Sequence, residues 1–181
     1  MTMRAPACMR PLAVLDRHGV FVGYASLFNR RDAAGDVVMP GAFAHSLAAR
    51  GVHGIRMLFQ HDPHEPIGSW IDIEEDDKGL HVRGRLNREV QRGRELLGLL
   101  AERGLDGLSI GFKTVSASRD RLTGARHLHR IDLWEISLVT FPMLAGARVT
   151  AVKAQARAAA ETLFTKGWAG KTLVETGSTV R

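Results

Sequence analysis

Two long stretches of alternating residues, joined by a short turn, constrain the fold of this chain more than any other feature. The stretch LSIGFKTVSASRD alternates, RLTGAR turns, and HLHRIDLWEISLVTF alternates again, with apolar members at Leu128, Ile131, Leu133, Ile136 and Leu138. Alternation of period two is typical of a half-buried strand, and two such strands around a short turn pair as a hairpin. The region 108–141 is therefore predicted to be antiparallel sheet.

Further strands and two helices are predicted upstream of this hairpin. The predicted strands are VFVGYASLF at 20–28, IRMLFQH at 55–61, and a hairpin of residues 67–76 and 79–86. A short helix is predicted from Pro40 to Arg50, and an amphipathic helix over 88–103 places Leu96, Leu99 and Leu100 at helical spacing. Because six or seven strands are not interleaved with helices, the expected fold class is α+β. We expect a mainly antiparallel, barrel-like sheet with flanking helices rather than βαβ units.

The chain length and a change of composition near the C-terminal end predict one domain followed by an appendage. The chain has 181 residues, 45% of them hydrophobic, which is enough for one sizeable core. After Ala151 the sequence becomes alanine-rich and then rich in Gly, Thr and Ser, so we predict a domain over 1–151 and an appendage over 152–181, with a mobile terminus. No apolar run approaches the ~20 residues of a membrane span, and no signal peptide is recognised, so a soluble intracellular protein is expected. A lone Cys8 excludes an intramolecular disulfide and a thiolate metal cluster.

The charge of the chain leaves a noncatalytic function open. A formal net charge of +6 suits an anionic partner such as nucleic acid or an acidic protein surface. The basic residues are scattered, however, without aromatic interleaving or a known nucleic-acid motif. A basic scaffold or nucleic-acid-binding module is thus an alternative to an enzyme.

Ser109 lies in a G-x-S-x-G pattern, Gly107 to Gly111, which is found at the nucleophile of α/β-hydrolases. That fold needs a helix directly after the serine and a histidine after the acid. Here the residues that follow Ser109 alternate like a strand, and the last histidine, His129, precedes the nearby acids. A base for Ser109 must therefore lie upstream.

The upstream candidate is His61, which ends an apolar strand before a predicted Pro-bounded loop. A histidine at such a rim suits a base with a pKa near ~6.5. His64 and Glu65 are expected in the loop itself and more exposed. A metal-dependent hydrolase is a second enzymatic hypothesis, drawn from a larger set of side chains: His61, Asp62, His64, Glu65, His127 and His129. Neither an H-E-x-x-H motif nor a facial-triad spacing supports it.

Three blocks in fixed order resemble one known family. They are LFQHDPHEPIGSW, GLDGLSIGF and WEISLVTFPMLAGARV, preceded by GYASLFNRRDAAGDVVMPGAF, and together they span about the first four-fifths of the chain. They resemble the prohead proteases of tailed bacteriophages, the serine peptidases of capsid maturation, whose fold is similar to herpesvirus assemblin. The resemblance implies an assemblin-like sheet and no metal or other cofactor.

The resemblance also implies residue roles. It makes His61 the general base, Ser109 the nucleophile and Glu135 the third member, although assemblin has a histidine in that third role. Asp132 is the rival acid; at three residues from Glu135 on one strand, the two are expected to face opposite sides. Oxyanion donors are expected near Gly146 or from Arg148, while Gly107 and Gly111 permit close backbone approach.

The resemblance finally implies a biological setting. It predicts an endopeptidase that trims the scaffolding segment of the major capsid protein, and itself, inside a procapsid in the cytoplasm of a bacterial host. Its partners would be the capsid protein and further copies of this chain. The source would be a phage, a prophage or a gene transfer agent.

Overall fold

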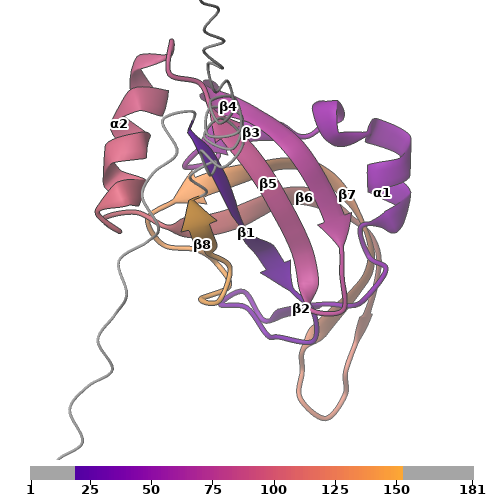
Figure 1. The fold of residues 1–181 in the computed structure, drawn as a ribbon. Coiled ribbons are helices and arrows are strands. Elements are labelled where there is room, and N and C mark those ends of the chain that lie inside the picture. Colours follow the sequence, from indigo (N-terminus) through magenta and orange to yellow (C-terminus); the bar gives the residue numbers. More distant parts are fainter. Residues whose placement is uncertain (1–18, 153–181) are drawn as a thin grey trace, which may run out of the picture.

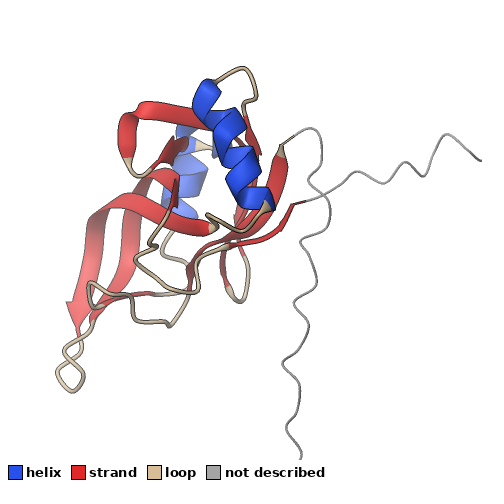
Figure 2. Cartoon of the chain, turned by 90° about the vertical axis from the view of Figure 1, so that its left-hand side faces the viewer, coloured by secondary structure: helices blue, strands red, loops and turns tan. Residues whose placement is uncertain are grey.

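The computed structural model describes residues 19–152, which form one eight-stranded sheet with two α-helices (Figure 1). The strands are β1 (Val20–Leu27), β2 (Asp36–Val38), β3 (Arg56–Phe59), β4 (Asp62–Glu75), β5 (Gly79–Leu86), β6 (Gly107–Arg119), β7 (Arg126–Val139) and β8 (Val149–Val152). The helices are α1 (Ala44–Arg50) and α2 (Gln91–Ala101), with a 3-10 turn at Val52–Gly54. In Figures 1 and 2 the two α-helices lie on opposite sides of the curved sheet.

The sheet curls until its two ends meet. β8, β1, β5, β4 and β3 pair antiparallel in that order, β3 joins β7 in parallel, and β7 pairs antiparallel with β6. The start of β6 then returns to the residues beside β8: the Leu108 amide donates to the Ala147 carbonyl at 2.9 Å, and the Val149 amide to the Asp106 carbonyl at 2.8 Å. The predicted α+β class with a mainly antiparallel, barrel-like sheet is confirmed. The parallel pairings of β7 with β2 and β3 depart from it.

The inward-facing side chains of the curved sheet form the core. Apolar residues from every long strand are buried there, including Phe21, Trp70, Val82, Leu108 and Leu133. Phe21 and Trp70 meet edge to face with ring centroids 5.8 Å apart. This core fixes which face of each strand points inward, and so places the polar residues that alternate with it.

Both helices are shorter than predicted. α1 begins only at Ala44, because Pro40 and Gly41 form a turn and the Phe43 amide donates to the Glu75 carboxylate at 2.9 Å. In α2, Leu96 and Leu100 are buried. Leu99 was expected on the same packed face, but it is 43% exposed.

Two short strands, β2 and β8, were not predicted. The last residue of β8, Val152, lies just past the predicted domain boundary. The rest of the predicted appendage, residues 153–181, lies outside the described residues, and so does Cys8 near the other end of the sequence. Across residues 19–152 no helix has the length and apolar character needed to cross a membrane.

Candidate active site

Ser109 is held on a continuous strand rather than at a nucleophile elbow. β6 continues for ten residues beyond it, to Arg119, so no helix follows the serine, as the alternation predicted. Ser109 pairs with Ser137 of β7, and it is only 7% exposed. Its position at the start of the β6–β7 ladder fixes its backbone through the neighbouring strand.

Close packing explains both glycines of the G-x-S-x-G pattern, and the contact is different for each. A Cβ at Gly107 would meet the Val139 carbonyl and the Pro142 ring, whereas a Cβ at Gly111 would collide with the Glu135 carboxylate. Gly111 pairs directly with Glu135 across the ladder. The missing side chain of Gly111 therefore leaves the space into which that carboxylate folds.

His61 lies in a two-residue turn between β3 and β4. Phe59 pairs with Asp62, so Gln60 and His61 are the two central residues of the hairpin, and their φ angles are 54° and 60°. Positive φ at both positions is the geometry of a type I′ turn, which glycine and asparagine favour and which is strained for other residues. The predicted loop at 62–66 is wrong, because β4 begins directly at Asp62. His64 is more exposed than His61, as expected, at 91% of its side chain against 42%, but Glu65 is not, at 35%.

The His61 ring is bonded to the Glu135 carboxylate. Nδ1 of His61 and Oε1 of Glu135 are 2.6 Å apart, with 12% of the Glu135 side chain exposed. This hydrogen bond, together with the negative charge of Glu135, raises the pKa of His61 above its ordinary value, against an opposing effect of burial. The bond to Nδ1 leaves Nε2 as the ring nitrogen that is free to act on another group.

Asp132 is the rival acid, and it has different partners. Its carboxylate accepts two hydrogen bonds from Arg50, at 2.7 and 2.8 Å, and one from Trp134 Nε1 at 2.7 Å. The Arg50 guanidinium is the main cause of a pKa of Asp132 far below the ordinary range. The structure thus brings Glu135, and not Asp132, to His61.

The expectation that the two acids face opposite sides of the strand is wrong. Gly111 pairs with Glu135 but Phe112 pairs with Leu133, so Trp134 is an extra residue that bulges out of β7. Leu133 and Ile136 are consequently both buried in the core although they are three residues apart. Because side chains alternate on either side of the bulge, Asp132 and Glu135 both point away from the core.

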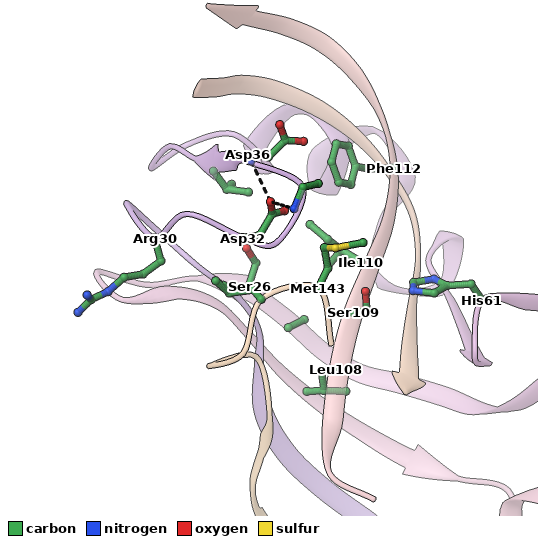
Figure 3. Close-up of a pocket in the computed structure, with 14 residues that line it drawn as sticks. Ser26, Arg30, Asp32, Asp36, His61, Leu108, Ser109, Ile110, Phe112 and Met143 are labelled. Carbon is green, nitrogen blue, oxygen red and sulfur yellow. Dashed lines mark hydrogen bonds between the residues drawn. The ribbon is translucent and has the colours of Figure 1, made fainter. Parts of the chain in front are cut away.

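Ser109 and His61 line one pocket of about 210 Å³. Apolar side chains form much of its wall, among them Ala25, Val38, Leu108, Ile110, Phe112, Met143 and Leu144; Ser26, Arg30, Asp32 and Asp36 complete the polar part. In Figure 3 the His61 ring and the Ser109 hydroxyl lie at the same end of this pocket, opposite Arg30. Both side chains therefore lie beside a mainly apolar wall.

The segment that precedes β8 forms one border of the pocket. Met143 and Leu144 line it, and Arg148 pairs with Gly107, two residues before Ser109. The Arg148 guanidinium is bonded to the Asp106 carboxylate and, at 2.9 Å, to the Ala145 carbonyl. The backbone of this segment is thus close to Ser109, whereas the Arg148 side chain is engaged elsewhere.

The residues of the metal hypothesis do not gather in one cluster. His64 bonds Asp62 at 3.0 Å, and His129 bonds Ser118 at 2.7 Å on the β6–β7 hairpin. Within residues 19–152 no three His, Cys, Asp or Glu side chains are grouped so that they could hold a metal ion.

The chain is similar to two curated relatives. It is 36% identical over 139 residues to the prohead protease of Enterobacteria phage HK97, covering 76% of this chain and 61% of that protein. It is 30% identical over 121 residues to the prohead protease of Escherichia phage T5, covering 66% of this chain and 56% of that protein. This chain therefore spans about three-fifths of the length of these relatives.

One solved structure with low sequence identity shares the fold, and a second aligns less well. The capsid assembly protease of bacteriophage T4 has a TM-score of 0.56 at 12% identity, covering 68% of this chain and 82% of that one. A protease of KSHV aligns with a TM-score of 0.48 at 14% identity, covering 72% of this chain and 64% of that one.

A family model places the chain. The model for caudovirus prohead serine proteases matches residues 10–162, most of the sequence and all of the described sheet. The resemblance carried by the three sequence blocks is confirmed, and the chain belongs to the caudovirus prohead serine protease family.

Proposed function

We propose that this protein is a serine endopeptidase with Ser109 as nucleophile, His61 as general base and Glu135 as the group that orients His61. The observation that carries the proposal is the 2.6 Å bond between His61 Nδ1 and Glu135 Oε1, made by a histidine that shares a pocket with Ser109. A serine hydroxyl needs a base, and the base works best when a third group fixes its tautomer and stabilises the imidazolium. Membership of a serine protease family supports the same assignment.

The proposed reaction begins with acyl transfer to Ser109. Its Oγ forms a bond to the carbonyl carbon of the substrate peptide, its proton passes to Nε2 of His61, and the carbonyl oxygen takes the displaced electron pair. When the tetrahedral intermediate collapses, the C–N bond breaks and the leaving amine takes the proton from His61. Water then gives a proton to His61 and attacks the acyl ester. The carboxyl product leaves, and the proton on His61 returns to the Ser109 oxygen.

For the oxyanion we propose backbone amides of the segment 143–148 as donors. This segment borders the pocket beside Ser109, and backbone N–H groups placed where charge develops are effective stabilisers. The Arg148 guanidinium is the weaker candidate of the two that the sequence offered, because it is already bonded to Asp106.

The proposed substrate is the scaffolding segment of a major capsid protein, together with this chain itself. The support is the family of this chain and the names of its two relatives, the prohead proteases of phages HK97 and T5. The site of action would be the inside of a procapsid in the bacterial cytoplasm, in a phage, a prophage or a gene transfer agent. Further copies of this chain would be partners there.

Coexpression tests the proposal. The full chain is produced with the precursor of the major capsid protein from the same genome, and the capsid protein is weighed by intact-mass spectrometry. We expect shortening with the wild type and with Ser116→Ala, an exposed serine of the same strand, but full length with Ser109→Ala. Equal processing by Ser109→Ala would overturn the serine mechanism, and an uncut precursor with the wild type would overturn the proposed substrate.

A further inference from the structure

Ser137 is a buried serine that the proposed mechanism has not used. It lies on β7 two residues after Glu135, on the same face of the strand, and it pairs with Ser109 on one side and with Leu58 of β3 on the other. Its exposed fraction is 0%, so it contacts neither solvent nor a substrate in the pocket. A serine in such a place must satisfy its hydroxyl inside the protein.

The Ser137 hydroxyl closes a ring of hydrogen bonds around His61. It accepts the backbone N–H of His61 at 3.1 Å and donates to Oε2 of Glu135 at 2.6 Å. The other oxygen of the same carboxylate, Oε1, bonds His61 Nδ1 at 2.6 Å. One hydroxyl thus connects the backbone of His61 to the carboxylate that binds its side chain.

The backbone at His61 requires such a restraint. Gln60 and His61 both have positive φ, a region that non-glycine residues occupy only when their surroundings hold them there. The Gln60 amide bonds the Leu138 carbonyl at 3.0 Å, and Gln60 Nε2 bonds Thr140 Oγ1 at 2.7 Å. The backbone of His61 itself is held by its bond to Ser137.

We infer that Ser137 is a positioning residue that fixes both the turn and the carboxylate on which the orientation of the His61 ring depends. The inference rests on the proposed function, because it concerns the base of that reaction. A carboxylate with one bonded oxygen can rotate about its terminal torsion, which is broad and weakly restrained. The bond from Ser137 to Oε2 stops that rotation and keeps Oε1 opposite Nδ1. Nε2 then points in one direction, as transfer of a proton from a fixed serine requires.

Two serine substitutions in the full chain test this inference. Ser137→Ala removes the hydroxyl while changing the buried volume little. Ser46→Ala is the matched control, because Ser46 is also buried, also accepts an amide of β7, from Leu133 at 2.8 Å, and also contacts a carboxylate, that of Asp132. It lies on α1 and has no bond to His61 or Glu135 among the interactions of the described residues.

Two readouts separate positioning from a general loss of stability. The first is the NMR titration of the His61 ring, assigned by its absence in His61→Gln. The second is the rate at which a fluorophosphonate probe labels Ser109. We expect Ser137→Ala to move the titration midpoint down towards the ordinary ~6.5 and to slow labelling on the order of 10-fold. Ser46→Ala should match the wild type in both.

An unchanged titration of His61 in Ser137→Ala would overturn the inference, as would an equal shift in Ser46→Ala. If the alanine protein does not fold, Ser137→Cys takes its place, because a thiol occupies the same position but is a weak hydrogen-bonding group. The titration needs no activity. If the wild type is not labelled at Ser109, the proposed function fails, while the titration still decides whether Ser137 positions His61.

Discussion

Asp132 and Glu135 are three residues apart on β7 and both point away from the core, yet their surroundings differ in kind. Asp132 is bonded to Arg50, which keeps its charge at any ordinary pH, and 33% of its side chain is exposed. Glu135 is 12% exposed and is bonded to His61, which gains and loses a proton near neutral pH. The two carboxylates therefore differ in their partners and not in their position on the strand. Asp132 joins a helix to the sheet, whereas Glu135 is suited to assist proton transfer.

The largest expected effect is at the nucleophile, on the Glu135 side of this comparison. Ser109→Ala should reduce capsid-protein cleavage on the order of 10⁶-fold, the scale for loss of a serine nucleophile. Circular dichroism and the melting temperature should stay as in the wild type, since one oxygen and little volume are lost. Substantial cleavage by the folded variant would contradict the serine mechanism, and neither Glu135 nor Asp132 would then have a role in it.

The next effect is at His61. His61→Ala should be nearly as damaging as Ser109→Ala, and the double variant should be no worse than either one, because residues that act as a unit do not contribute additively. Single-turnover cleavage rates of the three proteins measure this. Effects that multiply in the double variant would separate His61 from Ser109 and leave Glu135 without a catalytic partner.

A smaller and more informative effect is expected for Glu135→Gln. Loss of the third member of such a unit typically reduces the rate about 10- to 100-fold less than loss of the nucleophile or the base. The base acts in its neutral form, so the wild-type rate should rise with pH through a pKa of His61 held above ~6.5 by Glu135. Removing that negative charge lowers the pKa of His61, and the acid limb of the pH–rate profile should move to lower pH. A limb that stays in place would show that Glu135 does not govern His61.

The smallest effect on the reaction is expected for Asp132→Asn. It weakens the bond to Arg50 between β7 and α1, so the melting temperature should fall while the rate and its pH profile stay close to those of the wild type. Thermal unfolding and the same cleavage assay measure the two quantities. A large loss of rate at unchanged stability would transfer the third role to Asp132 and reverse the comparison.

Much of the sheet follows from the sequence because its long strands alternate clearly. The β6–β7 hairpin, β5 and β1 were predicted near their observed bounds, whereas β4 was predicted without its first five residues. β2 and β8, at three and four residues, are too short to show periodicity. The parallel pairing of β3 with β7 is a contact between distant segments that no local pattern records.

The candidate site could be predicted from the sequence only in part. Gln60-His61 carries no glycine or asparagine, so the tight turn that presents His61 gave no turn signal and was predicted as a strand end and loop. The bulge at Trp134 was implied by the spacing of Leu133 and Ile136, both apolar and three residues apart, but a regular strand was assumed. Ser137 was missed because a serine within a strand has no distinguishing pattern.

The central claim, that His61 and Glu135 activate Ser109, is tested most directly by mapping a fluorophosphonate adduct on the full chain. The probe reacts with a serine oxygen that a neighbouring base has activated, and peptide mass spectrometry locates the adduct. We expect one adduct at Ser109, formed faster as pH rises through the pKa of His61, slowed in Glu135→Gln and absent in His61→Ala. Failure to label Ser109, or labelling that His61→Ala leaves unchanged, would contradict the account.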